Sequence, residues 1–572
     1  MLVSAMLLVL LPQAAAGQRP ALRRDSFVLD PDALLRALPG ATGPAGVGAN
    51  LRMNRDLVGA LQAETAVAVN PRNPDNVVGT AVDTRLGYGN YAFYTSFDGG
   101  RTVAADAEFP LQPGWTGGGD PAIAFDAQGR VFLLGLQLNG NNNTGALYLH
   151  GSLDGGRVWP IRALVFQAPG NLPDKPFLAI DRSSSAFAGS LYASFTGFYA
   201  PPLDLHVVRS RDGGLTWSAP VFLGTGQGTS PAVGPDGSVF VAWDDYQGSI
   251  ILRYSRDGGV TWPGYQFVAP IVPNPSPLPP TSFRCNSFPT VATDHSSGPF
   301  RGRVYVCWSS RDQGSSEIFC AVSTDNGVHW SAPVRANDTR TNDQFFPSMD
   351  VDEAGTVWLS WFDRRDDPQN RRYGIWASAS LDGGRTWLPN WRVSDALSDP
   401  GTSGWIGDYG GTAARAGRAF PFWTDLRSGN YDAYLAPVQG DLEQSATTVL
   451  ASAGGTIDLP IKAGPARAGQ VHVVLAGFTG TSPGVDLGGG VRLHLNLDPL
   501  SSLSLSAANL APFVNTVGLT GAGGVPAAQP RLLAAPGLLT PLAGRDLIFA
   551  YLLLDPTWTP SYGSQPVVLR VQ

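Results

Sequence analysis

The sequence is poor in charge, in cysteine and in long apolar runs. Only 15% of its 572 residues are charged, and the net charge is −7. No basic stripe with interleaved aromatic residues occurs, so nucleic acid is not an expected partner. No stretch of about twenty apolar residues follows the N-terminal segment, so we expect no membrane span. Three cysteines are too few for a disulfide scaffold, so the chain must bury an apolar core instead.

Cysteine, histidine and lysine are each sparse. Cys307 and Cys320 flank a predicted hairpin and are candidates for a disulfide, with Cys285 as an alternative partner and three unpaired buried thiols as a further interpretation. The six histidines show no zinc spacing. Lysine occurs only at Lys175 and Lys462, so arginine abundance alone is poor evidence for a site.

The N-terminal segment MLVSAMLLVLLPQAAAGQ has a short apolar run followed by small residues. This pattern predicts a secretory signal peptide over residues 1–16 and a linker or leader over 17–46, although a basic N-terminal region is missing. We therefore expect the mature protein to be secreted, extracellular or periplasmic, and monomeric.

One phrase, S-x-D-x-G-x-x-W, occurs six times, once with its last position changed. Its aspartates are Asp98, Asp154, Asp212, Asp257, Asp325 and Asp382. A pair of short alternating apolar runs precedes each copy, and this larger pattern occurs seven times with starts 54 to 60 residues apart. Such a period with four short strands per unit predicts an all-β fold, a seven-bladed β-propeller over residues 47–439.

The seventh unit lacks the phrase and its fourth strand. Residues 49–56 resemble a fourth strand, so we expect the N-terminal strand to close the last blade. After residue 440, alternating strands with Gly and Pro turns predict a separate C-terminal β-sandwich over residues 440–572.

The repeated phrase resembles the Asp box, or BNR repeat, of the sialidase (neuraminidase) superfamily of propellers, and the resemblance covers about residues 47–439. The six box aspartates are expected to be structural, because Asp accepts hydrogen bonds from its own turn and Gly supplies positive φ. The tail resembles C-terminal β modules of secreted bacterial proteins. The resemblance implies that ligands bind at the face opposite the boxes, where the fourth strand of one blade leads to the first strand of the next.

Three loops after the second strands share the pattern Asp-x-Arg and belong to consecutive blades. They contain Asp83 and Arg85, Asp363 and Arg365, and Asp425 and Arg427, and Arg311 lies one position earlier in another blade. Sialidases hold the substrate carboxylate with an arginine triad, so the resemblance implies that these arginines converge on one mouth. The alternative is that each arginine pairs with its own aspartate.

The resemblance also implies a tyrosine nucleophile with a glutamate base and an aspartate acid. Tyr409 and Glu64 are the candidates for the first two roles, Asp120 or Asp174 for the acid, and Asp408 for substrate binding. The four carboxylates Glu64, Asp120, Asp174 and Asp408 are alternatively candidate ligands for Ca²⁺, and we expect no other cofactor. The Arg-Ile-Pro motif of sialidases is missing.

Three hypotheses follow from these patterns. The first is a glycan-directed enzyme, an exo-α-sialidase or related glycoside hydrolase of an acidic sugar. The second is a propeller that binds a glycan or protein without catalysis, and the third is a scaffold. Convergence of the arginines would favour a carboxylate ligand, whereas arginines folded back on their own aspartates would be structural.

Overall fold

The computed structural model describes residues 46–572 except 141–143, 169, 171, 199–202, 297, 299, 440–447, 462, 464–466, 468, 482–483, 488–490, 522–524 and 565. The predicted signal peptide and linker, up to residue 45, lie outside the described residues. Residues Val47–Gln439 form one compact unit, and the described part of Gly440–Gln572 belongs to a second.

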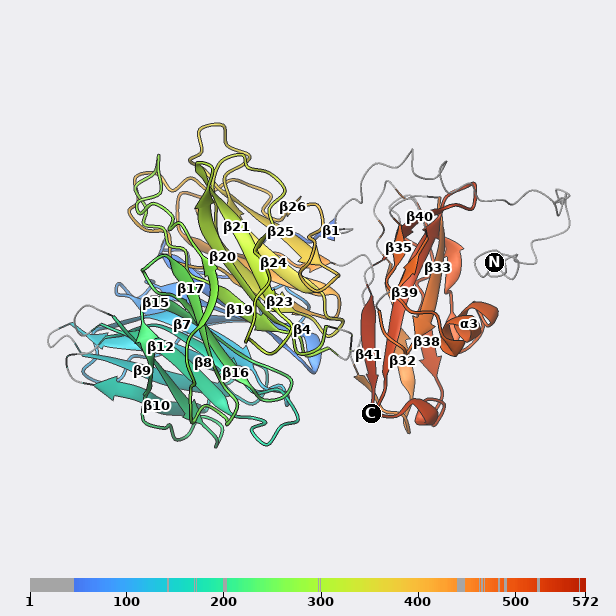
Figure 1. The fold of residues 1–572 in the computed structure, drawn as a ribbon, viewed down its shortest axis with the longest axis horizontal. Coiled ribbons are helices and arrows are strands. Elements are labelled where there is room, and N and C mark those ends of the chain that lie inside the picture. Colours follow the sequence, from blue (N-terminus) through green and yellow to red (C-terminus); the bar gives the residue numbers. More distant parts are fainter. Residues whose placement is uncertain are drawn as a thin grey trace, which may run out of the picture. The chain divides into compact units, whose positions relative to one another are not determined.

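The described part of residues 47–439 contains seven antiparallel sheets, and in six of them four strands pair in sequence order (Figure 1). We call these four strands A to D. The first three sheets are β3 (Gln62–Asn70), β4 (Asn73–Asp83), β5 (Asn90–Ser96) and β6 (Ala105–Glu108); β7 (Gly117–Phe125), β8 (Val131–Asn139), β9 (Thr144–Ser152) and β10 (Ile161–Ala168); and β11 (Pro173–Ile180), β12 (Leu191–Gly197), β13 (Asp204–Ser210) and β14 (Val221–Thr225). The next three are β15 (Gln227–Val233), β16 (Val239–Asp244), β17 (Ser249–Ser255) and β18 (Gln266–Pro270); β19 (Thr290–Thr293), β20 (Val304–Asp312), β21 (Ser315–Ser323) and β22 (Val334–Arg335); and β23 (Gln344–Val351), β24 (Val357–Asp363), β25 (Gly374–Ser380) and β26 (Trp391–Arg392).

The seventh sheet joins the two ends of this unit. Its strands are β1 (Gly46–Val47), β2 (Leu51–Arg52), β27 (Gly411–Arg415), β28 (Arg418–Asp425), β29 (Asp432–Leu435) and β30 (Val438–Gln439). Strand β2 pairs antiparallel with β29, which confirms the predicted N-terminal closing strand. A buried apolar cluster lies between each pair of consecutive sheets and between the seventh and the first. The sheets therefore close a ring, which is the arrangement of a β-propeller.

The box segments connect strands C and D and satisfy their own turns. In the copy at 210–217, the Ser210 hydroxyl donates to Asp212 Oδ1 over 2.7 Å, and the same oxygen accepts from the backbone amides of Leu215 and Thr216 at 3.1 and 3.0 Å. The Thr216 hydroxyl donates to Asp212 Oδ2 over 2.5 Å. The aspartates of the other five copies accept equivalent bonds from their serines and from backbone amides.

Each box also contacts the preceding sheet. The side chain of Asn76, in β4 of the first sheet, donates to the carbonyl of Gly155 in the second sheet's box over 2.9 Å. Trp159 of that box lies 5.1 Å from Phe93 and 5.2 Å from Phe109, ring centroid to ring centroid. The boxes thus lie at the end of the sheets where strands A and B are joined, and their tryptophans pack between sheets.

The described part of the second unit contains three sheets, and the two larger ones share a core. Its larger sheet has β31 (Thr448–Val449), β33 (Val471–Gly477), β37 (Val517–Leu519), β39 (Asp546–Leu554), β40 (Pro560–Gly563) and β41 (Val567–Val571). A smaller one has β32 (Gly455–Asp458), β36 (Phe513–Val514) and β38 (Arg531–Ala534), and β34 (Val485–Asp486) pairs with β35 (Arg492–Leu493). The six-stranded and the three-stranded sheet share one cluster of buried side chains, which includes Ile457, Leu532, Phe549 and Leu569.

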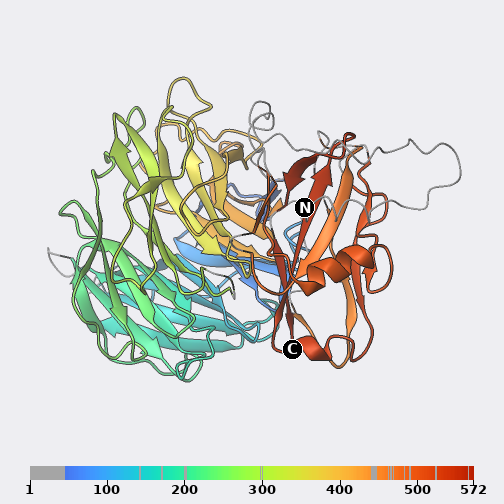
Figure 2. The same ribbon diagram turned by 45° about the vertical axis from the view of Figure 1, so that its right-hand side comes forward.

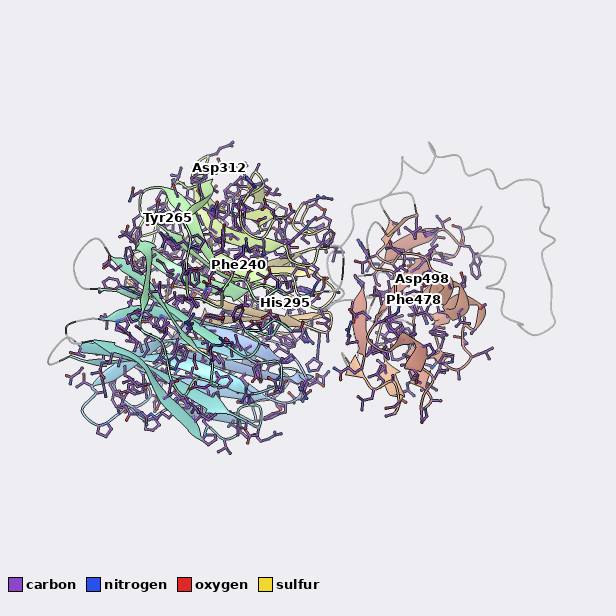
Figure 3. All side chains as sticks on the ribbon, turned by 60° about the horizontal axis from the view of Figure 1, so that its bottom comes forward. Phe240, Tyr265, His295, Asp312, Phe478 and Asp498 are labelled. Atoms are coloured by element: carbon purple, nitrogen blue, oxygen red, sulfur yellow. The ribbon has the colours of Figure 1, made fainter. Side chains whose placement is uncertain are left out.

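The described part of this unit also contains the short helix α3 (Pro499–Ser506) and the 3₁₀ turn η2 (Thr540–Leu542), which the alternating pattern did not predict (Figure 2). Asp498, labelled in Figure 3, caps α3 by accepting from the backbone amides of Leu500 and Ser501. This capping box with proline at N1 is a local helix start signal within an otherwise β sequence.

The three cysteines are buried free thiols. Cys307 and Cys320 are paired positions on the neighbouring strands β20 and β21, so the predicted hairpin is present while its thiols are unbridged. No helix in the described part of the chain is long and apolar enough to cross a membrane.

Candidate functional site

The A strands place charged side chains in a strained backbone conformation. The pairing of strands A and B is interrupted near the start of β3, β7, β11, β15 and β23. In the first three of these, the interrupted segment holds Glu64, Asp120 and Lys175, with φ of 55°, 46° and 48°. The fourth has Gly228 at φ 74° and the sixth sheet has Phe346 at φ 51°. These irregularities lie at the ring face opposite the boxes.

Asp408, which precedes β27, is bound by two cations. Arg284 donates from Nε and a terminal nitrogen to its two carboxylate oxygens over 2.9 and 2.6 Å. Lys175 Nζ lies 3.3 Å from Asp408 Oδ2. Burial would raise the pKa of Asp408, but Lys175 and Arg284 hold it below its ordinary value. Asp408 is therefore ionised, and its two carboxylate oxygens are bound by Arg284 and Lys175.

Lys175 is buried and lies between aromatic rings. Its Nζ lies 4.8 Å from the Phe288 ring centroid and 4.7 Å from that of Tyr409, within cation–π range. A cavity of about 60 Å³ adjoins it, lined by residues of the D–A loops and A strands that include Phe177 and Phe346. Lys175 thus brings a fixed positive charge to the centre of the carboxylates.

Glu64 and Asp174 are both held towards the protonated form. Burial, together with the charge of Asp120 and a hydrogen bond between the two side chains, raises the pKa of Glu64 well above its ordinary value. A hydrogen bond between two carboxyl groups requires a shared proton. Burial and then the charge of Asp120 raise the pKa of Asp174 to about 7, while Gln227 Nε2 donates to its Oδ2 over 3.1 Å.

Tyr409 lies among these groups. Its hydroxyl donates to the carbonyl of Pro121 over 3.5 Å, and its ring is 5.2 Å from that of Phe177. Burial and the charge of Glu64 raise the pKa of Tyr409 well above its ordinary value. The structure therefore brings Tyr409, Glu64, Asp120, Asp174 and Asp408 together.

The three Asp-x-Arg arginines do not join this cluster: of the two arrangements left open by the sequence, the structure has the one in which each arginine pairs with its own aspartate, and not convergence. Each guanidinium returns to its own aspartate and binds a second one. For Arg85 this is on strand D of its own sheet, and for Arg365 and Arg427 it lies in the loop that enters their sheet from the preceding one. Arg85 binds Asp83 at 2.7 Å and Asp106 at 2.7 Å. Arg365 binds Asp363 at 2.8 Å and Asp338 at 2.7 Å, and Arg427 binds Asp425 at 2.8 Å as well as Asp395.

The physical reason is the turn itself. Asp83, Asp363 and Asp425 are fully buried, and each accepts from the backbone amide two residues on, at 2.8 to 2.9 Å. A buried carboxylate needs a cation, and the arginine of the same turn supplies it. The guanidinium of Arg365 also lies 4.0 Å from the ring of Trp376 and that of Arg427 4.4 Å from Tyr434, both on strand C.

Two further predictions concern Arg311 and a Ca²⁺ site. Arg311 lies in β20 and its backbone amide donates to Val272 over 2.8 Å. Among the described residues, no group of three or more His, Cys, Asp or Glu side chains is arranged to hold a metal ion. Lys175 and Arg284 supply the positive charge beside Asp408 in place of the suggested Ca²⁺.

Sequence reasoning missed three members of the site, Lys175, Arg284 and Gln227. A signal existed for Lys175, because it is one of only two lysines in an arginine-rich sequence and follows the candidate Asp174. Arg284 lies in the long segment between β18 and β19, where no repeat pattern fixes its position.

No protein-family model and no curated protein matches the chain. Solved structures that resemble it include a protein of unknown function from Dyadobacter fermentans (16% identity, TM-score 0.39, covering 68% of this chain and 98% of that one). A GH93 α-L-arabinofuranosidase of Fusarium graminearum is similar at 13% identity and TM-score 0.41, covering 69% of this chain and 98% of its own. A sialidase from Streptococcus pneumoniae has 12% identity and TM-score 0.36, covering 68% and 70%.

Proposed function

We propose that the protein is a secreted glycoside hydrolase whose active site is the carboxylate cluster of Glu64, Asp120, Asp174 and Asp408. In this proposal the seven sheets are the blades of a seven-bladed propeller of the sialidase-like, Asp-box type, and residues 440–572 form an appended β-sandwich. The observation that carries the proposal is the strained backbone at Glu64, Asp120 and Lys175.

A left-handed conformation costs a residue other than glycine of the order of 1–3 kcal/mol. The equivalent segment of the fourth sheet has Gly228, which adopts the same conformation without that cost. Three consecutive sheets instead place a charged side chain there. Strain that persists at three equivalent positions, each with a chemically active side chain, is typical of a functional site.

The environments separate the carboxyl groups into acid and base. Asp174 is partly exposed and its pKa is raised to about 7, so it is a suitable general acid near neutral pH. Asp120 is also partly exposed and receives a hydrogen bond from the buried Glu64, so it is the opposing carboxylate. Lys175 and Arg284 fix Asp408 and limit the negative charge of the cluster.

The charge of the site favours a neutral sugar over an acidic one. Among the described residues, the cations bound in this cluster of four carboxyl groups are Lys175 and Arg284, and both already bind Asp408. The Asp-x-Arg arginines, which would have held a sialic acid carboxylate, are bound to aspartates. Tyr409 is a poor nucleophile here, because neighbouring carboxylates oppose its ionisation.

The test is hydrolysis of 4-methylumbelliferyl glycosides of neutral pentoses and hexoses, beside the α-sialoside, by the wild type, Asp174→Asn, Glu64→Gln and the surface control Asp395→Asn. We expect turnover of a neutral glycoside, a fall of roughly 100-fold or more in Asp174→Asn, and no change in the control. No turnover by the wild type, or turnover unaffected by Asp174→Asn, would overturn the proposal. Turnover of the sialoside alone would overturn the neutral substrate.

The second candidate is a propeller that binds glycans without catalysis. It is favoured by the cavity of about 60 Å³, which is smaller than the roughly 300–1,000 Å³ of most ligand pockets. Binding to a glycan array by a wild type that hydrolyses nothing would select it.

A further inference from the structure

The loop between β16 and β17 of the fourth sheet contains a variant of the Asp-x-Arg turn. Asp244 accepts a hydrogen bond from the backbone amide of Tyr246 over 2.8 Å. Asp83, Asp363 and Asp425 make the same bond to Arg85, Arg365 and Arg427. Tyr246 therefore occupies the position that an arginine holds in three other sheets.

Tyr246 differs from those arginines in backbone and direction. Its φ is 57°, in the left-handed region that is rare for a bulky side chain. The arginines have no such φ; Arg85 turns to strand D of its own sheet, and Arg365 and Arg427 turn to strand C of theirs. Tyr246 turns instead to the A strand, where its hydroxyl donates to Gln227 Oε1, and the residue is 56% exposed.

Gln227 connects this tyrosine to the candidate acid. It is the first residue of β15 and pairs with Asp244 in β16. While its Oε1 accepts from Tyr246, its Nε2 donates to Asp174 Oδ2 over 3.1 Å. In this orientation the amide hydrogen faces the carboxylate; turning the amide over would set its oxygen against ionised Asp174 and lose that bond.

We propose that Tyr246 forms the outer aromatic wall of the site, on which the apolar face of a neutral pyranose ring stacks, and that it positions Asp174 through Gln227. This inference rests on the proposed function and names the substrate contact of that same site. An exposed aromatic ring with a hydrogen-bonded polar tip offers a sugar both an apolar surface and a fixed orientation. A ring seated on Tyr246 lies beside the acid that Gln227 holds.

The positioning role is tested without a substrate, by following the Asp174 carboxyl carbon in ¹³C NMR titrations of the full chain. The signal is assigned by its absence in Asp174→Asn. Gln227→Leu removes the hydrogen-bond donor to ionised Asp174, so we expect the pKa of Asp174 to rise. Tyr246→Phe leaves the Gln227 amide free to turn its oxygen towards Asp174, so we expect the pKa to rise there too. Tyr265→Phe is the matched control, since Tyr265 (labelled in Figure 3) is 55% exposed and follows the box of the same sheet. Unshifted titrations in both Gln227→Leu and Tyr246→Phe would overturn the positioning role.

The stacking role is tested with the neutral 4-methylumbelliferyl glycosides. We expect Tyr246→Ala to raise KM, or the Kd measured by saturation-transfer NMR, about tenfold, Tyr246→Phe to change it little, and Tyr265→Ala not at all. An unchanged KM and Kd in Tyr246→Ala would overturn stacking. A wild type that neither binds nor hydrolyses these glycosides would overturn both the stacking and the proposed function, and the carbon titration would still decide the positioning role.

Discussion

The two faces of the ring use the same residue type in opposite ways. On the box face, the hydroxyl and amide of Thr216 and the hydroxyl of Ser210 lower the pKa of Asp212 to about 2. On the opposite face, burial and the charge of Asp120 raise the pKa of Asp174 to about 7. The turn surrounds Asp212 with donors, whereas the A strands surround Asp174 with other carboxyl groups. The neighbours of an aspartate therefore set its pKa, and with it whether the side chain stabilises a turn as a carboxylate or holds a proton.

Truncating a box tryptophan should have the largest effect. Trp262 is buried in the cluster that joins the third and fourth sheets, and its Nε1 donates to Gly259 over 3.2 Å. We expect Trp262→Ala to lower the free energy of unfolding of the ring by about 3–5 kcal/mol in denaturant titrations, since it leaves a cavity. The Asp174 titration should stay in place; a large shift would show that the two faces are not independent.

Removing the buried cation should disturb the opposite face most. Lys175→Met leaves Asp408 with Arg284 alone and removes the charge that lowers the pKa of Glu64 and Asp174. We expect a loss of about 3 kcal/mol in the free energy of unfolding and an upward shift of the Asp174 titration. Unchanged stability and an unchanged titration would contradict the role given to Lys175.

The pH dependence of stability should carry the signature of Asp174. Its pKa is about 7 in the folded protein against 3.8 in the unfolded chain, so the folded state binds the proton more tightly. Its contribution to stability is present in full below pH 3.8 and is lost as the pH rises to about 7. The Tm of Asp174→Asn minus that of the wild type should therefore increase between pH 4 and 7 and level off above. A difference that does not change with pH would contradict the raised pKa.

Removing a box aspartate should cost less than any change in the core. Asp212→Ala leaves two amides and two hydroxyls to water, so we expect a loss of about 1 kcal/mol, comparable to that of a helix cap. Thermal unfolding measures it, with Leu215→Ala as a control in the same turn. A loss as large as that of Trp262→Ala would mean that the box carries more than its own turn.

The Asp-x-Arg arginines should have the smallest effect on chemistry. Arg365 is bound to Asp363 and Asp338, away from the carboxylate cluster. We expect Arg365→Gln to leave kcat and KM on a neutral glycoside unchanged while the Tm falls. Loss of activity at an unchanged Tm would contradict this prediction and show that Arg365 contributes to the active site.

What the sequence predicts follows from how far apart the interacting residues lie. The box is local, because all hydrogen-bond partners of Asp212 lie within four residues of it. The pattern of the box therefore predicted the turn, and the repetition of the box predicted the ring of sheets. Tyr409 and Glu64 came together because the repeat set the phase of their strands. The side chains of the Asp-x-Arg arginines could not be placed, because the repeat sets the backbone position of a residue and not the direction of its side chain. Arg284 binds Asp408 across 124 positions of sequence, and no repeat encodes that pair.

One titration tests the contrast between the two faces most directly: the carboxyl carbons of Asp174 and Asp212 followed in the same ¹³C-labelled sample of the full chain. We expect Asp174 to titrate near 7 and Asp212 near 2. If both titrated near 3.8, the ordinary value for aspartate, the proton-carrying site and the account built on it would be contradicted.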